Sequence, residues 1–328
     1  MKAAVYTRYG APDVVHVTDV EKPAPKDGEV LVRVRAASVN PLDWHFVRGL
    51  PYLLRMQSGL RTPKVTRLGV DLAGHVDAVG KNVTEFKPGD AVFGTARGAF
   101  AEYVCASELA LVMTSDHITL EQAASVPVAS LTALLGLRDK GKIQPGQKVL
   151  INGASGGVGT FAVQVAKALG ADVTGVCSTR NVDVVRSLGA DRVIDYTKED
   201  FTSILQAYDI LLDNVGNHSL SACRRILNPK GKYIMVSGPA GRWIAPFDRA
   251  IGAMVLSRFV SQDMGLLLLG NRNQGGLTMI RELLNAGKVR PVIDRTYKLS
   301  EVQAAIRYVE EGHARGKVII TVESTEPM

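Results

Sequence analysis

A glycine-rich turn between an apolar run and an amphipathic segment constrains this chain more than any other feature. The apolar run 149–151 is followed by NGASGGVG at residues 152–159, and a helix is predicted over Val158–Leu169. Glycines at such a turn permit positive φ, let the backbone approach a pyrophosphate and allow close helix–strand packing. The helix N-terminus adds N–H groups and a positive dipole end. This order of elements favours a dinucleotide-binding unit over a plain turn. The predicted cofactor contacts in the turn are Ala154, Ser155, Gly156, Gly157, Val158 and Gly159.

The end of the next predicted strand, Asp172–Cys177, indicates which dinucleotide is bound. Enzymes that use NAD place an acidic residue about 20 residues after the turn, against the ribose 2′-OH. Here Ser178, Thr179 and Arg180 follow the strand, and no acid does. Hydroxyls and a guanidinium suit a 2′-phosphate, so the pattern predicts NADPH (NADP), bound in part by Ser178 and Arg180. The alternative is that Arg180 is only a solvated residue at a helix start.

The pattern of residue types and predicted elements changes near Leu120. Before it, β-branched runs are broken by Gly and Pro, which indicates a β-rich domain. After it, strands and helices alternate as in a doubly wound parallel sheet, and the tail is expected to return to the first domain. The predicted strands of the alternating part are Lys148–Ile151, Asp172–Cys177, Arg192–Asp195, Asp209–Asp213, Lys232–Val236 and Leu266–Leu269, and its helices include Val182–Leu188, Ser219–Leu227 and Arg249–Val260. The tail is predicted to contain helices at Leu277–Ala286 and Ser300–Glu311, with Ser300 as an N-cap, and a strand at Lys317–Val322.

Composition limits the class of protein. The 328 residues are enough for two ordinary domains. The net charge of +7 would allow polyanion binding, but no run of five basic residues and no dedicated nucleic-acid motif exists, so dispersed surface charge is favoured. No segment approaches the roughly 20 apolar residues of a membrane span. The N-terminus lacks a signal peptide's apolar region, and Cys105, Cys177 and Cys223 are widely spaced, so we expect a cytoplasmic protein.

Several short motifs carry a resemblance to a known family. They are NPLD at 40–43, GVDLAGHVDAVG at 69–80, the turn at 154–159 and RGKV at 315–318. With these motifs in order, essentially the whole chain resembles the medium-chain dehydrogenase/reductase superfamily, and within it the zinc-independent quinone oxidoreductase group, which includes ζ-crystallin and the reticulon-interacting-protein-like branch. The resemblance implies an α/β fold in which a Rossmann doubly wound parallel sheet is inserted in a GroES-like β-barrel catalytic domain, with the active site in the cleft. The implied ranges are 1–121 for the first part of the GroES-like domain, 122–262 for the Rossmann NADPH-binding domain, and 263–328 for the last Rossmann strand and the return to the catalytic domain.

The zinc ligands of the superfamily's alcohol dehydrogenases are missing. A structural zinc needs four closely spaced cysteines, and the chain has no CxxC. The catalytic zinc needs Cys and His, yet no Cys lies near Asn40–Leu42 and Asp71 stands where those enzymes have a His-Glu pair. His45 and His75 remain, but a lone histidine is more often structural than a ligand. We therefore predict no metal.

A reductase without a Lewis acid is best suited to quinones and α,β-unsaturated carbonyls, because hydrogen bonds alone can stabilise the developing enolate or phenolate. The resemblance implies that Asn40 lies near the nicotinamide ribose, Thr132 at a helix start near the nicotinamide, and Tyr196 on the adenosine side. The alternatives are that Asn40 and Thr132 are caps and that Tyr196 is a core aromatic. Further implied contacts in the cofactor crevice are Asn214, Val215, Ser237 and Gly238.

The segment that lines the substrate cleft in relatives corresponds here to Asp43, Trp44, His45 and Tyr52. Asp43 and His45 are the candidate catalytic residues, as proton relays. The alternative is that Asp43 caps a helix and that solvent protonates the product. Trp243, in the stretch Gly241–Phe247, could form an apolar substrate wall or an interface. Relatives commonly dimerise through the sheet edge near Leu266–Leu269, so we expect a homodimer.

Three functions follow from these observations. The leading hypothesis is an NADPH-dependent, zinc-independent reductase of quinones or enones. The enzymatic alternative is an NADP-dependent alcohol or carbonyl dehydrogenase, which the missing zinc ligands disfavour. The third is a non-catalytic, NADPH-responsive protein that binds RNA or another protein, because some ζ-crystallin relatives do so.

Overall fold

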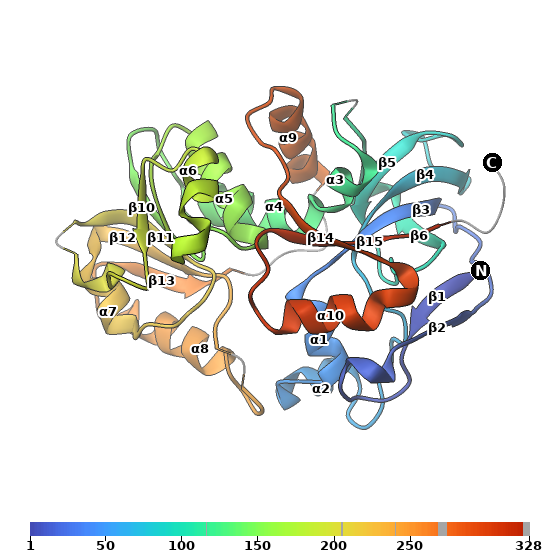
Figure 1. Ribbon diagram of the computed structural model, residues 1–328, viewed down its shortest axis with the longest axis horizontal. Coiled ribbons are helices and arrows are strands. Elements are labelled where there is room, and N and C mark those ends of the chain that lie inside the picture. Colours follow the sequence, from blue (N-terminus) through green and yellow to red (C-terminus); the bar gives the residue numbers. More distant parts are fainter. Residues whose placement is uncertain (116, 205, 240, 268–273, 324–328) are drawn as a thin grey trace. The chain divides into compact units, whose positions relative to one another are not determined.

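The structure, a computed structural model, describes residues 1–115, 117–204, 206–239, 241–267 and 274–323. It divides into two compact units (Figure 1). Unit 1 comprises Met1–Val128, Asn271–Asn285 and Pro291–Met328, and unit 2 comprises Ala129–Gly270 and Ala286–Arg290. Residues 122–128, assigned to the second domain from the sequence, belong to unit 1. Both ends of the chain therefore belong to the same unit.

Unit 1 is built on a seven-stranded sheet of order β14-β15-β3-β4-β5-β7, in which β6 also pairs with β3. The β-branched side chains of Val30, Val32 and Val34 alternate along β3 and are buried together in the core of the unit. Strand β15 pairs with β3, with Val318 opposite Val39, so the C-terminal segment completes this sheet. The strands are β3 (Glu29–Val39), β4 (Asp71–Val79), β5 (Ala91–Thr95), β6 (Tyr103–Ser107), β7 (Leu111–Met113), β14 (Ile293–Lys298) and β15 (Lys317–Thr321), with β1 (Lys2–Val5) and β2 (His16–Asp19) in a separate pair.

Short helices accompany this sheet. They are α1 (Pro41–Arg48), α2 (Arg55–Ser58), α3 (Leu120–Ala124), α9 (Gln274–Asn285) and α10 (Val302–Glu310). The prediction that Ser300 caps the last helix is wrong. Ser300 lies inside a 3-10 turn, Leu299–Glu301, and the Glu301 carboxylate instead accepts a hydrogen bond from the Lys298 backbone N–H at 2.8 Å. Glu301 is the third residue of the turn, and it bonds the backbone N–H of the capping residue Lys298 as the glutamate of a capping box does.

The start of α1 carries a buried acid. Pro41 supplies the fixed φ that suits a first helical residue. The Asp43 carboxylate accepts hydrogen bonds from the backbone N–H groups of Asn40, at 2.8 Å, and Gly69, at 3.2 Å. Burial raises the pKa of Asp43 to about 7, although both N–H groups act against this shift. Asp43 thus joins the start of α1 to the segment that leads into β4.

Unit 2 is a six-stranded parallel sheet of order β10-β9-β8-β11-β12-β13. The chain enters at the central strand β8, moves outward through β9 and β10, and then returns to β11, which is the order of a doubly wound Rossmann sheet. The predicted fold class is therefore confirmed for this unit. The strands are β8 (Lys148–Asn152), β9 (Asp172–Cys177), β10 (Arg192–Asp195), β11 (Tyr208–Asp213), β12 (Leu227–Met235) and β13 (Asp263–Leu266).

The helices of unit 2 cover both faces of its sheet. In Figure 1, α5 and α6 lie on one face and α7 and α8 on the other. The helices are α4 (Pro127–Leu134), which continues as a π-helix (Leu135–Lys140), α5 (Gly157–Ala168), α6 (Val182–Ser187), α7 (Leu220–Arg225) and α8 (Phe247–Leu256). None of the helices in the described part of the chain is long and apolar enough to cross a membrane.

Two predicted boundaries near the last strand differ from the structure. Helix α8 ends at Leu256 rather than Val260, and β13 starts at Asp263 rather than Leu266. The hydroxyl of Ser257 donates to the Gln262 carbonyl at 3.2 Å and accepts from the Met264 N–H at 3.0 Å, so it turns the chain from helix to strand. The end of the predicted strand, residues 268–269, lies outside the described residues.

The raised pKa of Asp43 predicts a pH-dependent stability. A carboxyl whose folded pKa lies above its ordinary value of 3.8 stabilises the fold fully below about pH 4, and this contribution is lost as the pH rises through about 7. We expect the unfolding free energy of the wild type, relative to that of Asp43→Asn, to fall by up to about 4 kcal/mol over this range. Urea unfolding at a series of pH values measures it. A difference that stayed constant or rose with pH would contradict the assignment.

Candidate functional site

The glycine-rich turn after β8 has the conformation that the sequence predicts. Gly153 adopts φ = 78°, which is a left-handed conformation that other residues rarely take. Gly159 lies in α5, and a Cβ atom there would lie 2.1 Å from the Gly153 carbonyl oxygen. Internal geometry therefore requires glycine at both positions, because the backbone of the turn and that of the helix approach closely.

Gly156 is different, because nothing inside the protein requires it. Its φ is −81°, and a Cβ atom there would meet only the Gly153 carbonyl, at 3.5 Å. It directly precedes α5, a 12-residue helix whose first N–H groups have no partner within the helix. A residue without a side chain at this position leaves the helix N-terminus accessible. The turn therefore fits the pyrophosphate of a dinucleotide.

The corner after β9 holds more charge than the sequence analysis anticipated. Arg180 is exposed, and its side chain has no hydrogen-bond or ion-pair partner in the described part of the chain. Asp195, the last residue of β10, lies opposite Cys177 and accepts a hydrogen bond from the Thr179 hydroxyl at 2.5 Å. Lys198 forms an ion pair with Asp195 at 3.5 Å. The Thr179 bond is the main cause that lowers the pKa of Asp195 to about 2, so Asp195 is negatively charged and is engaged by Thr179 and Lys198.

The other predicted cofactor residues of unit 2 also follow strand ends. Tyr196 follows β10 and is exposed, Asn214 and Val215 follow β11, and Ser237 and Gly238 come shortly after β12. Because the strands are parallel, their carboxyl ends meet at one edge of the sheet, where ligands bind in such folds. Thr132 is buried near the end of α4 and not at a helix start, which corrects that detail of the prediction.

Two buried amide oxygens at this edge lack a protein partner. The Asn181 Nδ2 group donates to the hydroxyls of Ser155 and Ser178, at 3.0 and 3.2 Å, and Asn214 Nδ2 donates to the Asn152 carbonyl at 2.9 Å. The Oδ1 atoms of Asn181 and Asn214 are buried and accept no hydrogen bond within the described structure. An unsatisfied buried acceptor costs free energy, so both oxygens fit a site where a ligand or water donates to them.

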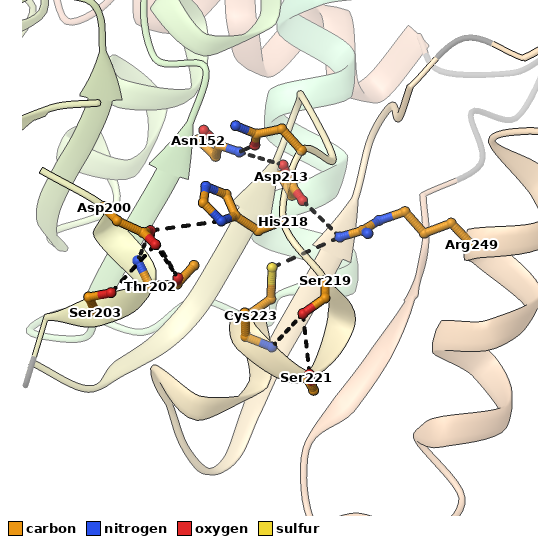
Figure 2. Close-up of polar contacts among 12 residues, drawn as sticks. Asn152, Asp200, Thr202, Ser203, Asp213, His218, Ser219, Ser221, Cys223 and Arg249 are labelled. Carbon is orange, nitrogen blue, oxygen red and sulfur yellow. Dashed lines mark hydrogen bonds and ion pairs between the residues drawn. The ribbon is translucent and has the colours of Figure 1, made fainter. Parts of the chain in front are cut away.

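Asp213, at the end of β11, holds this edge together (Figure 2). Its carboxylate accepts hydrogen bonds from Asn152 Nδ2 at 2.8 Å, from the Tyr233 hydroxyl at 2.8 Å and from the Gly216 N–H at 2.8 Å. The guanidinium of Arg249, in α8, forms an ion pair with the same carboxylate, with 3.6 Å between Arg249 Nη2 and Asp213 Oδ2. The buried charge is therefore compensated, and it fixes the loops after β8 and β11 relative to each other.

Unit 1 contains a second buried polar cluster. The Asp71 carboxylate accepts hydrogen bonds from the Ser38 hydroxyl at 2.7 Å, from Asn40 Nδ2 at 2.9 Å and from the Val128 N–H at 2.9 Å. The Lys317 ammonium donates to Asn40 Oδ1 at 2.6 Å and lies 3.4 Å from Asp71 Oδ2. Lys317 is only 3% exposed and Asp71 is completely buried. The cluster therefore fixes the orientation of the Asn40 amide, whose two ends are both bonded within the protein.

This cluster does not fit a zinc ion. Zinc in dehydrogenases is bound by thiolate and imidazole ligands, whereas Asn40 offers an amide and Asp71 a carboxylate. The Lys317 ammonium already contacts both side chains, and a second cation beside it would be repelled. Across the described residues, no three His, Cys, Asp or Glu side chains form a group that could hold a metal.

The predicted substrate residues of unit 1 surround α1. His45 is half-buried, its Nδ1 lies 2.8 Å from the Leu50 carbonyl, and its ring stacks on Trp44 with centroids 3.6 Å apart. Because a carbonyl only accepts, Nδ1 carries the proton, and burial lowers the pKa of His45. Tyr52 lies in the turn before α2, with the Arg55 guanidinium 4.8 Å from its ring centroid. Trp243 belongs to unit 2 and is 73% exposed.

The sequence analysis missed several residues that build these clusters. Asn152 and Asp213 each end an apolar strand, and a polar residue at that position is a signal that could have identified them. Asp195 likewise ends β10, and Asn181 comes shortly after the end of β9. Lys317 gave no comparable signal, because its partner Asp71 is 246 residues away in the chain.

Comparisons with known proteins agree with this architecture. The profile of the alcohol dehydrogenase GroES-like domain matches residues 26–116, and that of the zinc-binding dehydrogenases matches residues 188–320. The mitochondrial NAD(P)H oxidoreductase RTN4IP1 of Mus musculus is 35% identical, over 98% of this chain and 89% of that protein. The chloroplast envelope quinone oxidoreductase homolog of Arabidopsis thaliana is 34% identical, over 98% of each.

A solved structure supports the same relationship. The quinone oxidoreductase from Coxiella burnetii superposes with a TM-score of 0.86 at 31% identity, and the match covers 98% of this chain and 99% of that one. The GroES-like domain, the doubly wound sheet and these similarities over nearly the whole length identify one family. The chain belongs to the medium-chain dehydrogenase/reductase superfamily, in the quinone oxidoreductase group.

Proposed function

We propose that this protein is an NADPH-dependent, zinc-independent reductase of quinones or α,β-unsaturated carbonyls. The observation that carries the proposal is the open Gly156 at the start of α5, beside two buried amide oxygens that lack protein partners. The relatives support the reaction class, because RTN4IP1 is named an NAD(P)H oxidoreductase and two others are named quinone oxidoreductases. NADPH, when bound, supplies the hydride.

The preference for NADPH rests on the corner after β9. The Arg180 side chain has no partner in the described part of the chain, whereas Thr179 and Lys198 already engage the carboxylate of Asp195. A 2′-phosphate would therefore meet the Arg180 guanidinium, with the hydroxyl of Ser178, two residues earlier in the chain, as a donor. The remaining contacts proposed for the cofactor are Asn40, Thr132, the turn 154–159, Tyr196, Asn214, Val215, Ser237 and Gly238.

The buried cluster of unit 1 supports a metal-free reaction. Lys317 provides a fixed positive charge in this cluster, but its ammonium is bonded to Asn40 and Asp71. We infer that it orients the Asn40 amide rather than polarising a carbonyl. Quinones and enones suit such a site, since their developing oxyanions need hydrogen bonds and not a Lewis acid.

The two candidate proton relays differ in their surroundings. Both carboxylate oxygens of Asp43 accept backbone hydrogen bonds, so we assign Asp43 to positioning α1. His45 donates through Nδ1 to Leu50 and keeps Nε2 available as an acceptor in its neutral form. Because its lowered pKa makes it a weak store of protons at neutral pH, we propose that solvent protonates the product. Trp44, Tyr52 and Trp243 remain the proposed substrate contacts.

We also propose a homodimer in a reducing, cytoplasmic compartment. Cys105, Cys177 and Cys223 are free thiols, and burial is the main factor that raises the pKa of each. Unpaired cysteines are typical of reducing compartments. The mouse and Arabidopsis relatives carry mitochondrial and chloroplast names.

A substrate panel tests the reaction class. We expect NADPH oxidation with quinones or enones and little with saturated ketones, because the residues around Asn40 supply no Lewis acid. The rate should change less than about twofold after treatment with a chelator. Zinc-dependent turnover, or turnover confined to alcohols and saturated ketones, would favour the dehydrogenase alternative. Binding of NADPH without any turnover would favour the non-catalytic alternative.

Arg180→Ala tests the cofactor preference. The loss of charge-assisted bonds to a 2′-phosphate should raise the KM for NADPH about 10–100-fold. The KM for NADH should change less than about threefold, since NADH has no such phosphate. Arg225→Ala, which removes an exposed arginine of α7, is the matched control and should change neither value. Equal effects of Arg180→Ala on both cofactors would argue against a 2′-phosphate contact.

A further inference from the structure

One buried amide connects the two parts of unit 2 that are proposed to hold the phosphates of the cofactor. Asn181 is only 6% exposed, and its Nδ2 atom lies 3.0 Å from the hydroxyl oxygen of Ser155 and 3.2 Å from that of Ser178. Ser155 belongs to the glycine-rich turn between β8 and α5, whereas Ser178 belongs to the corner after β9. A primary amide has two N–H groups, so Asn181 can donate to both hydroxyls at once.

These two bonds determine what the serine hydroxyls can do. An amide N–H only donates, so each serine oxygen accepts from Asn181 and directs its own O–H elsewhere. Among the described residues, none accepts a hydrogen bond from the hydroxyl of Ser155 or of Ser178. Both serines are partly exposed, so a ligand can reach them. Asn181 therefore leaves two hydroxyl groups that still need an acceptor.

We propose that Asn181 is a positioning residue that prepares both serines for phosphate and so contributes to the preference for NADPH. A phosphate oxygen is a charged acceptor, which matches a hydroxyl restricted to donating and gives a bond about twice as strong as one between neutral groups. Ser155 would donate to the diphosphate and Ser178 to the 2′-phosphate. The ribose 2′-OH of NADH is a neutral group and would gain less from Ser178. The inference rests on the cofactor site proposed above and adds a residue that acts on the cofactor through two others.

Asn181→Asp reverses the arrangement with almost no change in shape. A carboxylate only accepts, so both serine hydroxyls would turn their protons toward it and away from the cofactor. The Asn181 Oδ1 atom has no donor in the described structure, so the serines are the donors at hand for the new charge. We expect the Kd for NADP+, measured by isothermal titration calorimetry, to rise at least about 100-fold. The Kd for NAD+ should rise only about tenfold, since NAD+ loses the bond from Ser155 alone.

A neutral variant in a double-mutant cycle separates positioning from added charge and from a structural role. Asn181→Leu removes the amide without adding charge, and it should raise the Kd for NADP+ about tenfold, because the hydroxyls can then turn to other acceptors. In a protein that carries Ser155→Ala and Ser178→Ala, the same substitution should change this Kd less than about twofold, since no hydroxyl remains to be oriented. Asn285→Asp adds the charge of Asn181→Asp at an exposed position at the end of α9, and this matched control should change neither Kd. Circular dichroism of every variant confirms that it is folded.

Three outcomes would overturn the role of Asn181. Tight binding of NADP+ by the Asn181→Asp variant would mean that the amide oxygen, and not its nitrogen, serves the two hydroxyls. An equal loss of NADP+ and NAD+ affinity would remove the link to the 2′-phosphate. An effect of Asn181→Leu that is as large without the serines as with them would reveal a structural residue. A wild type that binds NADP+ more tightly than NAD+ in any of these cases leaves the proposed function standing, whereas a wild type that binds neither contradicts both.

Discussion

The buried contact between Lys317, Asn40 and Asp71 is the interaction on which unit 1 depends. It joins β15, from the end of the chain, to β4 and to the start of α1. Breaking a buried ion pair from one side typically costs about 3–5 kcal/mol, because the remaining charge is left uncompensated. Ser38 and the Val128 N–H saturate the Asp71 carboxylate, so the cluster is complete within the protein. The Lys317 ammonium therefore balances the charge of Asp71 within the polypeptide itself.

Unit 2 also contains a buried carboxylate whose charge is compensated within the protein. Asp213 is buried and compensated by Asn152, Tyr233, Gly216 and Arg249, and this rigid centre fixes the loops at the carboxyl edge of the sheet. The unsatisfied positions lie around it: the start of α5 at Gly156, and the amide oxygens of Asn181 and Asn214. The residues around Asp213 are fully hydrogen-bonded, whereas the amide oxygens of Asn181 and Asn214 accept no bond from the described residues. Such a site is preorganised for a ligand.

Much of the fold could be predicted because the signals are local. The glycine-rich turn and the alternating strands of unit 2 follow from neighbouring residues, and the structure confirms the doubly wound sheet. The clusters could not be predicted, since Lys317 and Asp71 meet across 246 residues and only the fold brings them together. Asp195 was missed for a related reason: the search for an acid followed β9, whereas the acid comes from the adjacent strand β10. Ser300 was misassigned because a 3-10 turn that is capped at Lys298 precedes α10, so Ser300 lies inside that turn.

The central claim is that the chain transfers hydride from NADPH to carbon of a conjugated carbonyl without a metal. The most direct test uses NADPH deuterated at both C4 positions, a simple enone, and enzyme treated with a chelator. We predict that mass spectrometry of the saturated product finds one deuterium, on the β-carbon. A product without deuterium, or turnover that returns only when zinc is added, would contradict the claim.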